Sequence, residues 1–277
     1  MSTVQCFGYT WITNSQPLPP SVYAPPAPNL PYYNANMWQP QNVSVAGGAM
    51  QLAVARNSGW TWNPNANRLE PSTGPDQIWA AAQAVLQLPA GQQLTYGTFS
   101  VTVEPVGGWG PFVGGNTASG QNTSTIFGAF TFDTAAAAPF NEMDVVEIGY
   151  QNQNQSGAWI NQQPGGPSNS DAQFAVQPWD EGNPGNPNWD YVHRIALDPG
   201  TGAVTITMEW QEGQPLSWAA SWPGGTPVTW QTPASTPIPS PTSTMSFYLN
   251  LWPYGGPSTN QPVTFNVTNV QVPLGSS

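Results

Sequence analysis

The chain has 277 residues, and its three Lys+Arg against 14 Asp+Glu give a formal net charge of -11 at pH 7. Basic residues supply most of the affinity of proteins for nucleic acids, so this balance excludes a nucleic-acid partner. All three basic residues are arginines, and the lack of lysine excludes a P-loop, a Schiff-base lysine and a protein-kinase site. At 39% hydrophobic residues with 14 Trp, the chain can nevertheless bury a sizeable core.

Cysteine and histidine occur once each, as Cys6 and His193. An internal disulfide and a His/Cys zinc site are therefore excluded, and no metal site is expected from these residues. No apolar run is long enough to span a membrane. The start, "MSTVQCFGYTW", lacks the basic and apolar regions of a signal peptide. This leaves a cytoplasmic protein or a mature secreted domain, and the polar, Pro-rich, Lys-free composition favours the second. We expect the extracellular protein to be a monomer.

The few basic groups also bear on behaviour at low pH. When the carboxylates protonate, the positive charge cannot exceed about +5, from three arginines, His193 and the N-terminus. Self-repulsion and protonation of paired carboxylates drive acid unfolding, and this composition limits both. We therefore expect an acid-tolerant protein; the alternative is an inherited composition without adaptive meaning.

In chain order, residues 1–31 form a Pro-rich N-terminal arm, packed on or leading into the domain, and its proline-dense part is 15–31. Short segments of β character follow, separated by Gly, Pro and Asn clusters, and alternation is clear in 98–104 and 203–210. This pattern predicts one all-β domain over 32–277, a sandwich or jelly roll. The predicted strand segments are 42–55, 96–106, 125–133, 142–148, 172–178, 203–210, 246–252 and 263–272.

Two segments are ambiguous. Alanine propensity alone makes 79–88, "WAAAQAVLQL", a helix, but a strand is the more economical interpretation among so many strands. Residues 233–244, "PASTPIPSPTST", have the composition of an interdomain linker. Only about thirty residues follow, too few for an independent domain, so we interpret this segment as a loop inside one domain.

The residues 142–148, "EMDVVEI", place Glu142, Asp144 and Glu147 together in a chain with only 6% charged residues. A solvated acidic strand edge is the simplest alternative, but the intervening apolar residues indicate a strand whose other face is buried. Like charges on one face repel, so a cluster of three acids is unfavourable and indicates a functional role. Retaining glycosidases use two carboxyl groups about 5–5.5 Å apart, and an aspartate between them can tune their protonation.

The spacing of the acids adds a geometric condition. Side chains of a strand alternate faces, so Glu142 and Asp144 share a face, but Glu147 would point the other way. One extra residue, a β-bulge at Val145–Val146, returns Glu147 to the shared face. The interpretation as a catalytic site therefore predicts a bulge at this position.

"EMDVVE" resembles the E-[ILV]-D-x-x-E motif of the bulged, laminarinase-like branch of glycoside hydrolase family 16, with Met at the usual Ile/Leu/Val position. Weaker likenesses fall in family order in "YGTFSVTVEP", "TIFGAFTFD", "DAQFAVQPWD", "VHRIAL" and "FYLNLWPYGG", and together they cover about residues 36–273. The resemblance implies a concanavalin A-like β-jelly roll, a sandwich of two antiparallel sheets with substrate in a concave cleft.

The resemblance also implies residue roles: Glu142 as nucleophile, Asp144 as assisting acid and Glu147 as general acid/base. Asn250 and Trp252 match substrate-binding positions of the family's Asn-Leu-Trp strand. The resemblance implies no required cofactor. A structural calcium away from the cleft is left as an alternative, and no local Asp/Asn run identifies ligands for it.

Tryptophans in Gly/Pro/Asn-rich surroundings are further candidates, because sugars stack on exposed aromatic rings. Trp109 and Trp179 are the substrate-binding candidates of this kind, with packing over the core edge as the alternative. His193 lacks the G-x-S-x-G elbow that a hydrolase triad would need, so a structural or cleft-edge role is favoured.

Together these observations predict a retaining endo-β-glycan hydrolase, a β-1,3- or mixed β-1,3/1,4-glucanase whose partner is the polysaccharide. A non-catalytic carbohydrate-binding or cell-surface protein on the same fold is the alternative from another class. A transglycosylase is a third, and nothing in the sequence separates transfer from hydrolysis.

Overall fold

The protein is nearly all β-structure, as expected from its sequence. The computed structural model describes residues 2–13, 37–57, 60–63, 68–71, 78–110, 112, 125–135, 142–149, 172–177, 191–197, 199–200, 202–253 and 263–276. Within these ranges helical structure is limited to 3-10 geometry, in η1 (Pro40–Asn42) and at Tyr191. None of the described segments is a helix long and apolar enough to cross a bilayer.

One layer of the structure carries the acidic segment at its centre. Its strands run in the order β14-β13-β12-β11-β18-β8, and the β1–β2 hairpin continues it beyond β8. All neighbouring pairs in this layer are antiparallel. The bounds are β1 Ser2–Cys6, β2 Tyr9–Thr13, β8 Ile78–Gln87, β11 Thr125–Asp133, β12 Glu142–Ile148, β13 Ala172–Gln177, β14 Val192–Ile195 and β18 Met245–Pro253.

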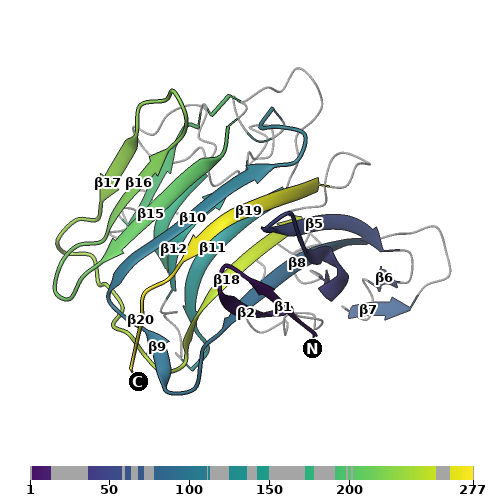
Figure 1. Cartoon of the computed structure of the whole chain (residues 1–277), viewed down its shortest axis with the longest axis horizontal. Coiled ribbons are helices and arrows are strands. Elements are labelled where there is room, and N and C mark those ends of the chain that lie inside the picture. The colour runs from purple at the N-terminus through teal and green to yellow at the C-terminus, as the bar shows by residue number, and fades with distance from the viewer. Residues whose placement is uncertain are drawn as a thin grey trace.

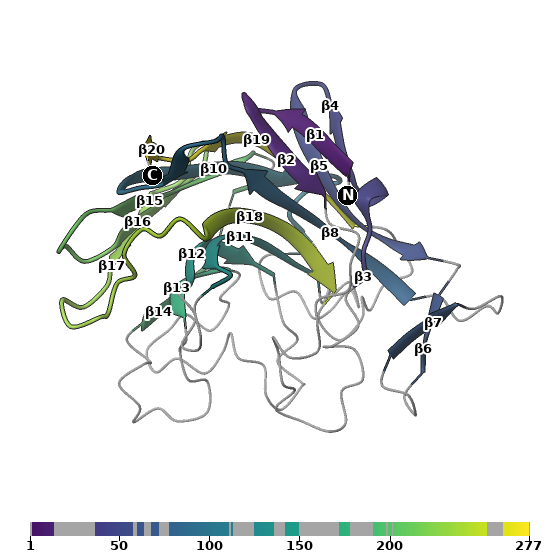
Figure 2. The same ribbon diagram turned by 90° about the horizontal axis from the view of Figure 1, so that it is seen from below.

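The second layer covers the inner face of the first (Figure 1, Figure 2). Its order is β5-β19-β10-β15-β16-β17, and β4 pairs with β5. The bounds are β4 Val43–Ala46, β5 Ala49–Asn57, β10 Gly97–Pro105, β15 Val204–Trp210, β16 Ser217–Ser221, β17 Val228–Gln231 and β19 Val263–Gln271. Alternating burial along β10, β15 and β19 shows that one face of this layer packs on the core.

The two layers meet along β8, whose beginning pairs with β5 and whose end pairs with β18. The short strands lie off this path: β3 pairs with β8, β6 with β7, and β9 with β20. Their bounds are β3 Met37–Trp38, β6 Trp60–Asn63, β7 Arg68–Pro71, β9 Gln92–Leu94 and β20 Leu274–Ser276. The architecture is the expected jelly-roll sandwich of two antiparallel sheets.

Aromatic side chains between the layers form the centre of the core. Phe127 of β11 stacks on Phe265 of β19, with ring centroids 5.3 Å apart. Phe247 of β18 stacks in the same way on Phe99 of β10 at 5.7 Å. All four rings are fully buried, so these contacts fix the first layer against the second and hold its outer face in place.

Both ambiguous segments are resolved as the sequence analysis proposes. The alanine-rich segment is strand β8, and Ala80, Ala81, Ala82 and Ala84 are at most 2% exposed. Small side chains suit a strand that joins both layers, and this packing overrides helix propensity. Residues 232–244 are a loop of the same domain, since its Pro239 carbonyl accepts from Trp210 Nε1 at 3.1 Å.

The N-terminal division is only partly within the described residues. Residues 2–13 form β1 and β2 and extend the first layer, while 14–31 lie outside the described residues. The boundary at residue 31 stays a prediction.

Candidate active site

The acidic strand β12 contains the expected bulge. Asp144 lies opposite Phe130 of β11, whereas the next pair on that side is Val146 with Ala129, so Val145 has no partner of its own. On the other side, the pairing with β13 also shifts between Asp144 and Glu147. The extra residue restores Glu147 to the face that carries Glu142 and Asp144. The predicted bulge at Val145–Val146 is confirmed.

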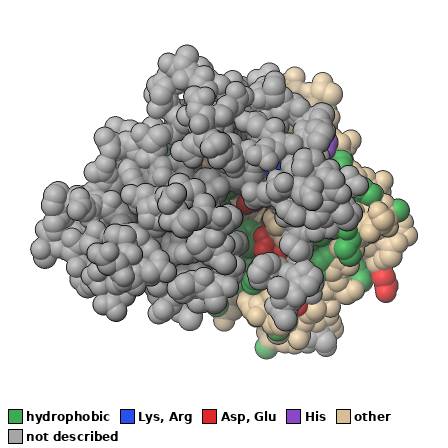
Figure 3. All heavy atoms as spheres, turned by 180° about the vertical axis from the view of Figure 1, so that it is seen from behind, with side chains coloured by type: hydrophobic (Ala, Val, Ile, Leu, Met, Phe, Trp, Pro, Cys, Tyr) green, Lys and Arg blue, Asp and Glu red, His purple; other side chains and the backbone are tan. Residues whose placement is uncertain are grey.

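The three acids point away from the core. Met143, Val145, Val146 and Ile148 of the same strand all belong to the core cluster, so the acids occupy the outer face of the first layer. Figure 2 shows β18 curving so that this face is concave. Acidic side chains are visible together near the middle of the molecule from this side (Figure 3).

Strand pairing arranges the outer face in rows that cross the layer. One row contains Glu147, with a direct cross-strand partner on each of its neighbours, and none of its side chains is a core residue. In order across the strands, this row is Arg194, Gln173, Glu147, Gly128, Asn250 and Gln83. The position in this row next to Asn250 is a glycine, Gly128. A Cβ there would clash with Oδ1 of Asn250.

Two glutamines of β13 hold two of the acids. Gln177 Nε2 donates to Asp144 Oδ2 at 3.2 Å, and Gln173 Nε2 donates to Glu147 Oε2 at 2.6 Å. Glu142 and Asp144 are in addition hydrogen-bonded to each other. The acids therefore have different surroundings: Asp144 is 1% exposed and Glu142 8%, whereas Glu147 is half-buried.

Burial dominates the protonation of this site. It raises the pKa of Glu142 to about 8; the charge of Glu147 adds to the rise, and the hydrogen bond with Asp144 opposes it. Burial also raises the pKa of Asp144 well above its ordinary value, as do the charge of Glu142 and the hydrogen bond with Glu142. The shared hydrogen bond lowers the pKa of Glu142 and raises the pKa of Asp144, so within this pair it favours the proton on Asp144.

The bulge is held from the second layer. The indole N–H of Trp218, on β16, crosses the core and donates to the backbone carbonyl of Asp144 at 3.0 Å. The Trp218 ring also stacks on Phe174 of β13 with centroids 5.8 Å apart. A buried carbonyl next to an irregular ladder needs such a donor, and Trp218 supplies it.

Aromatic rings flank the acids on the outer face. Phe130 of β11 stacks on Tyr248 of β18 at 5.2 Å, and Phe132 meets Tyr248 edge-on at 6.2 Å. All three rings are half-buried. Burial, then the charges of Glu142 and Asp133, raise the pKa of Tyr248, so its hydroxyl remains a neutral hydrogen-bonding group beside Glu142.

Two of the other predicted site residues share this face. Asn250 lies in the row of Glu147, and its buried Oδ1 accepts no hydrogen bond from any described residue. Trp252, two residues further along β18, is half-buried and packs on Ile126, Ala175 and Val192. The structure thus brings Asn250 and Trp252 to the same face as the three acids.

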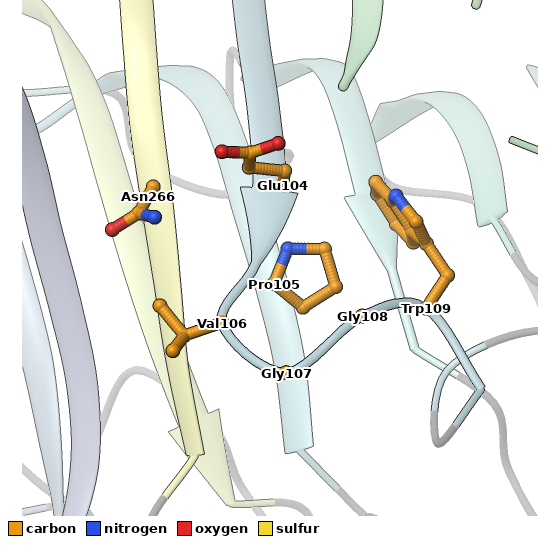
Figure 4. A pocket seen from close by; sticks show the side chains of 7 residues that line it. All are labelled: Glu104, Pro105, Val106, Gly107, Gly108, Trp109 and Asn266. Carbon is orange, nitrogen blue, oxygen red and sulfur yellow. The ribbon is translucent and has the colours of Figure 1, made fainter. Parts of the chain in front are cut away.

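Trp109 lies elsewhere. It is 2% exposed, donates from Nε1 to the Gly202 carbonyl at 2.7 Å and meets Phe265 edge-on. It borders a shallow hollow of about 430 Å³ at the end of β10, which Glu104 and Asn266 also line (Figure 4). The ring offers no open face for a sugar, so the alternative of packing at the core edge describes Trp109.

Trp179, the other loop tryptophan, is outside the described residues. His193 of β14 stacks on Trp230 of β17, with centroids 5.3 Å apart and ring planes within 9°. Burial lowers the pKa of His193. Its position at the edge of the sandwich agrees with the structural role favoured by the sequence.

The sequence analysis missed Gln173, Gln177 and Trp218, which touch the acids from other strands. A glutamine or a tryptophan in a strand gives no catalytic signal by itself, so only the strand register could have found them. Among the described residues, no group of three or more His, Cys, Asp or Glu could hold a metal ion. A structural calcium stays a prediction.

The fold and the site define an all-β sandwich with three acids on the concave face of one layer. No protein-family model and no curated protein matches the chain. Solved structures are similar to it. SCLam, a non-specific endo-β-1,3(4)-glucanase from family GH16, aligns with TM-score 0.48 and 14% identity over 88% of this chain and 77% of its own.

Two further solved structures are similar to the same extent. The κ-carrageenase of Pseudoalteromonas carrageenovora aligns with TM-score 0.48 and 11% identity, over 86% of this chain and 84% of its own. An immunostimulatory antigen and pseudo β-1,3-glucanase of Mycobacterium tuberculosis aligns with TM-score 0.45 and 13% identity, over 86% of this chain and 80% of its own. At these identities and TM-scores, the likenesses carry no argument about the activity of this chain.

Proposed function

We propose that the protein is a retaining β-glycan hydrolase. The observation that carries this proposal is the bulge of β12, which places Glu142, Asp144 and Glu147 on one face with three different environments. Retaining hydrolysis needs an anionic nucleophile and a protonated acid/base on the same side of the strand. It needs no metal, in keeping with the expectation that no cofactor is required.

Glu142 is the nucleophile in this proposal. It attacks the anomeric carbon, and the bond to the leaving sugar breaks as Glu147 protonates the departing oxygen. Water then attacks the glycosyl-enzyme, and Glu147 takes a proton from that water. The hydrogen bond with Asp144 lowers the pKa of Glu142 and so favours its carboxylate form, against the effect of burial.

The first step needs Glu142 ionised and Glu147 protonated. The charge of Glu147 raises the pKa of Glu142, so ionising both glutamates at once is disfavoured. One proton shared by the pair is therefore retained over a broad pH range. The active form is the one in which that proton resides on Glu147.

The substrate class we propose is a neutral β-glucan, with β-1,3 or mixed β-1,3/1,4 linkages. A net charge of -11 opposes binding of sulfated or uronic-acid polymers. Half-buried aromatic rings beside the acids suit the apolar C–H faces of uncharged sugars.

The test incubates wild type, Glu142→Gln and Glu147→Gln with β-glucans, galactans and xyloglucan at about pH 5, and measures new reducing ends. We expect cleavage of a β-glucan by wild type and a loss of at least about 10³-fold in Glu142→Gln. Glu104→Gln, on the outer face of the second layer, is the matched control and should keep full activity. Binding without cleavage by wild type would favour a carbohydrate-binding protein, and products longer than the substrate would favour a transglycosylase.

A further inference from the structure

The row that contains Glu147 includes two buried polar residues that the proposed mechanism does not use. Gln173 is 0% exposed and Arg194 is 1% exposed. Arg194 Nε donates to Gln173 Oε1 at 3.3 Å, and Gln173 Nε2 donates to Glu147 Oε2 at 2.6 Å. The three side chains thus form a hydrogen-bonded chain across β14, β13 and β12.

Chemistry fixes the direction of this chain. An arginine can only donate hydrogen bonds, so the Gln173 amide must present its oxygen to Arg194. Its NH₂ group is then necessarily turned toward Glu147. A glutamine without this neighbour could offer either end to the carboxyl group, so Arg194 decides which end Glu147 meets.

Gln173 lies between Arg194 and Glu147 in this row and is hydrogen-bonded to both. A guanidinium paired with Glu147 would strongly favour the carboxylate, and a carboxyl group so paired is a poor general acid. A neutral amide between them orients Glu147 with a weaker preference for its charged form. We propose that Gln173 is a positioning residue for Glu147, and that Arg194 sets the orientation of Gln173. This inference rests on the proposed function, because it assigns Glu147 the role of acid/base.

The test measures the titration of Glu147 directly, without relying on activity. The chain has only seven glutamates, so ¹³C labelling of their carboxyl carbons gives a tractable NMR spectrum, and Glu147→Gln assigns the signal. Gln173→Leu removes the donated hydrogen bond at similar volume. We expect the Glu147 pKa to rise by about one unit in Gln173→Leu, and by less in Arg194→Met.

Gln177→Leu is the matched control, because Gln177 also lies on β13 but donates to Asp144; it should leave the Glu147 titration nearly unchanged. In wild type, the side-chain amide signals of Gln173 should titrate with the same midpoint as Glu147. This measurement does not depend on the folding of any variant. The inference is overturned if the Glu147 pKa in Gln173→Leu stays within about 0.2 units of the wild-type value. It is also overturned if the amide signals of Gln173 do not change with the titration midpoint of Glu147.

Activity separates this inference from the proposed function. If wild type hydrolyses a β-glucan, Gln173→Leu should lose about tenfold in kcat/KM, and the alkaline limb of its pH profile should move to higher pH. If wild type hydrolyses no glycan, the proposed function fails, and the NMR titration still decides the role of Gln173.

Discussion

Glu142 and Asp144 are buried at a cost in stability that ordinary packing would avoid. Both lie in a hydrogen-bonded pair of carboxyl groups with a third carboxyl group, Glu147, on the same face. Removing carboxylates from water disfavours their charged forms, and like charges nearby add to this effect. Groups perturbed in this way cluster at functional sites, which is the residue-scale reason to regard the acids as a site.

The raised pKa of Glu142 makes stability depend on pH. An unfolded glutamate titrates near 4.3, whereas burial raises the pKa of folded Glu142 to about 8. Between these values the folded state binds more protons, so this contribution is complete below about pH 4.3 and is lost as the pH rises through about 8. We expect the free energy of unfolding of wild type to fall over this window relative to that of Glu142→Gln.

Urea denaturation of both proteins at about pH 4, 6 and 8 measures this difference. Glu104→Gln controls for the loss of a carboxylate elsewhere in the chain. A gap between wild type and Glu142→Gln that does not change with pH would contradict the assigned burial of Glu142.

At the scale of elements, the bulge in β12 could be predicted from the sequence, but its supports could not. Because side chains of a strand alternate between its two faces, Glu147 can share a face with Asp144 only if one extra residue lies between them. The strand pairing places that residue at Val145. Trp218 lies 74 residues away from the carbonyl it binds. Its partner follows from how two layers face each other, and alternation within a strand carries no such information.

The alanine-rich strand β8 is a second case in which local sequence does not determine the structure. Its local preference is helical, and only the need for small side chains where the layers join makes it a strand. Gln173 and Arg194 are likewise ordinary strand residues until the register aligns them with Glu147.

Trp218→Phe should loosen the bulge while leaving the core filled. Phenylalanine keeps a ring against Phe174 but lacks the N–H that satisfies the Asp144 carbonyl. We expect a loss of about 1–3 kcal/mol in the free energy of unfolding, together with a fall in glucan hydrolysis. Denaturation and initial-rate measurements on the same preparation test both.

Trp210→Phe is the matched control for this variant. Its Nε1 also donates to a backbone carbonyl, that of Pro239 in the loop before β18, and its ring meets those of Tyr96 and Phe99. It should lose comparable stability and keep its activity. Equal activity loss in both variants, or none in Trp218→Phe, would show that the bond to Asp144 does not hold the site.

At the scale of the whole molecule, the composition and the site both favour function at acidic pH. The buried acids favour protonation, and the chain has few groups that become positive in acid. We propose that the protein is acid-tolerant and works outside the cell. The wild-type denaturation series, extended to about pH 3, should show no collapse of stability.

The central claim is that Glu142 forms a covalent bond to the sugar while Glu147 acts from the same face. A 2-deoxy-2-fluoro-β-glucoside oligomer with a good leaving group should trap that intermediate, because fluorine slows its hydrolysis. Peptide mass mapping measures where the sugar is attached. The account predicts one glycosyl unit on Glu142, absent in Glu142→Gln; label on another residue, or none from a protein that cleaves β-glucan, would contradict it.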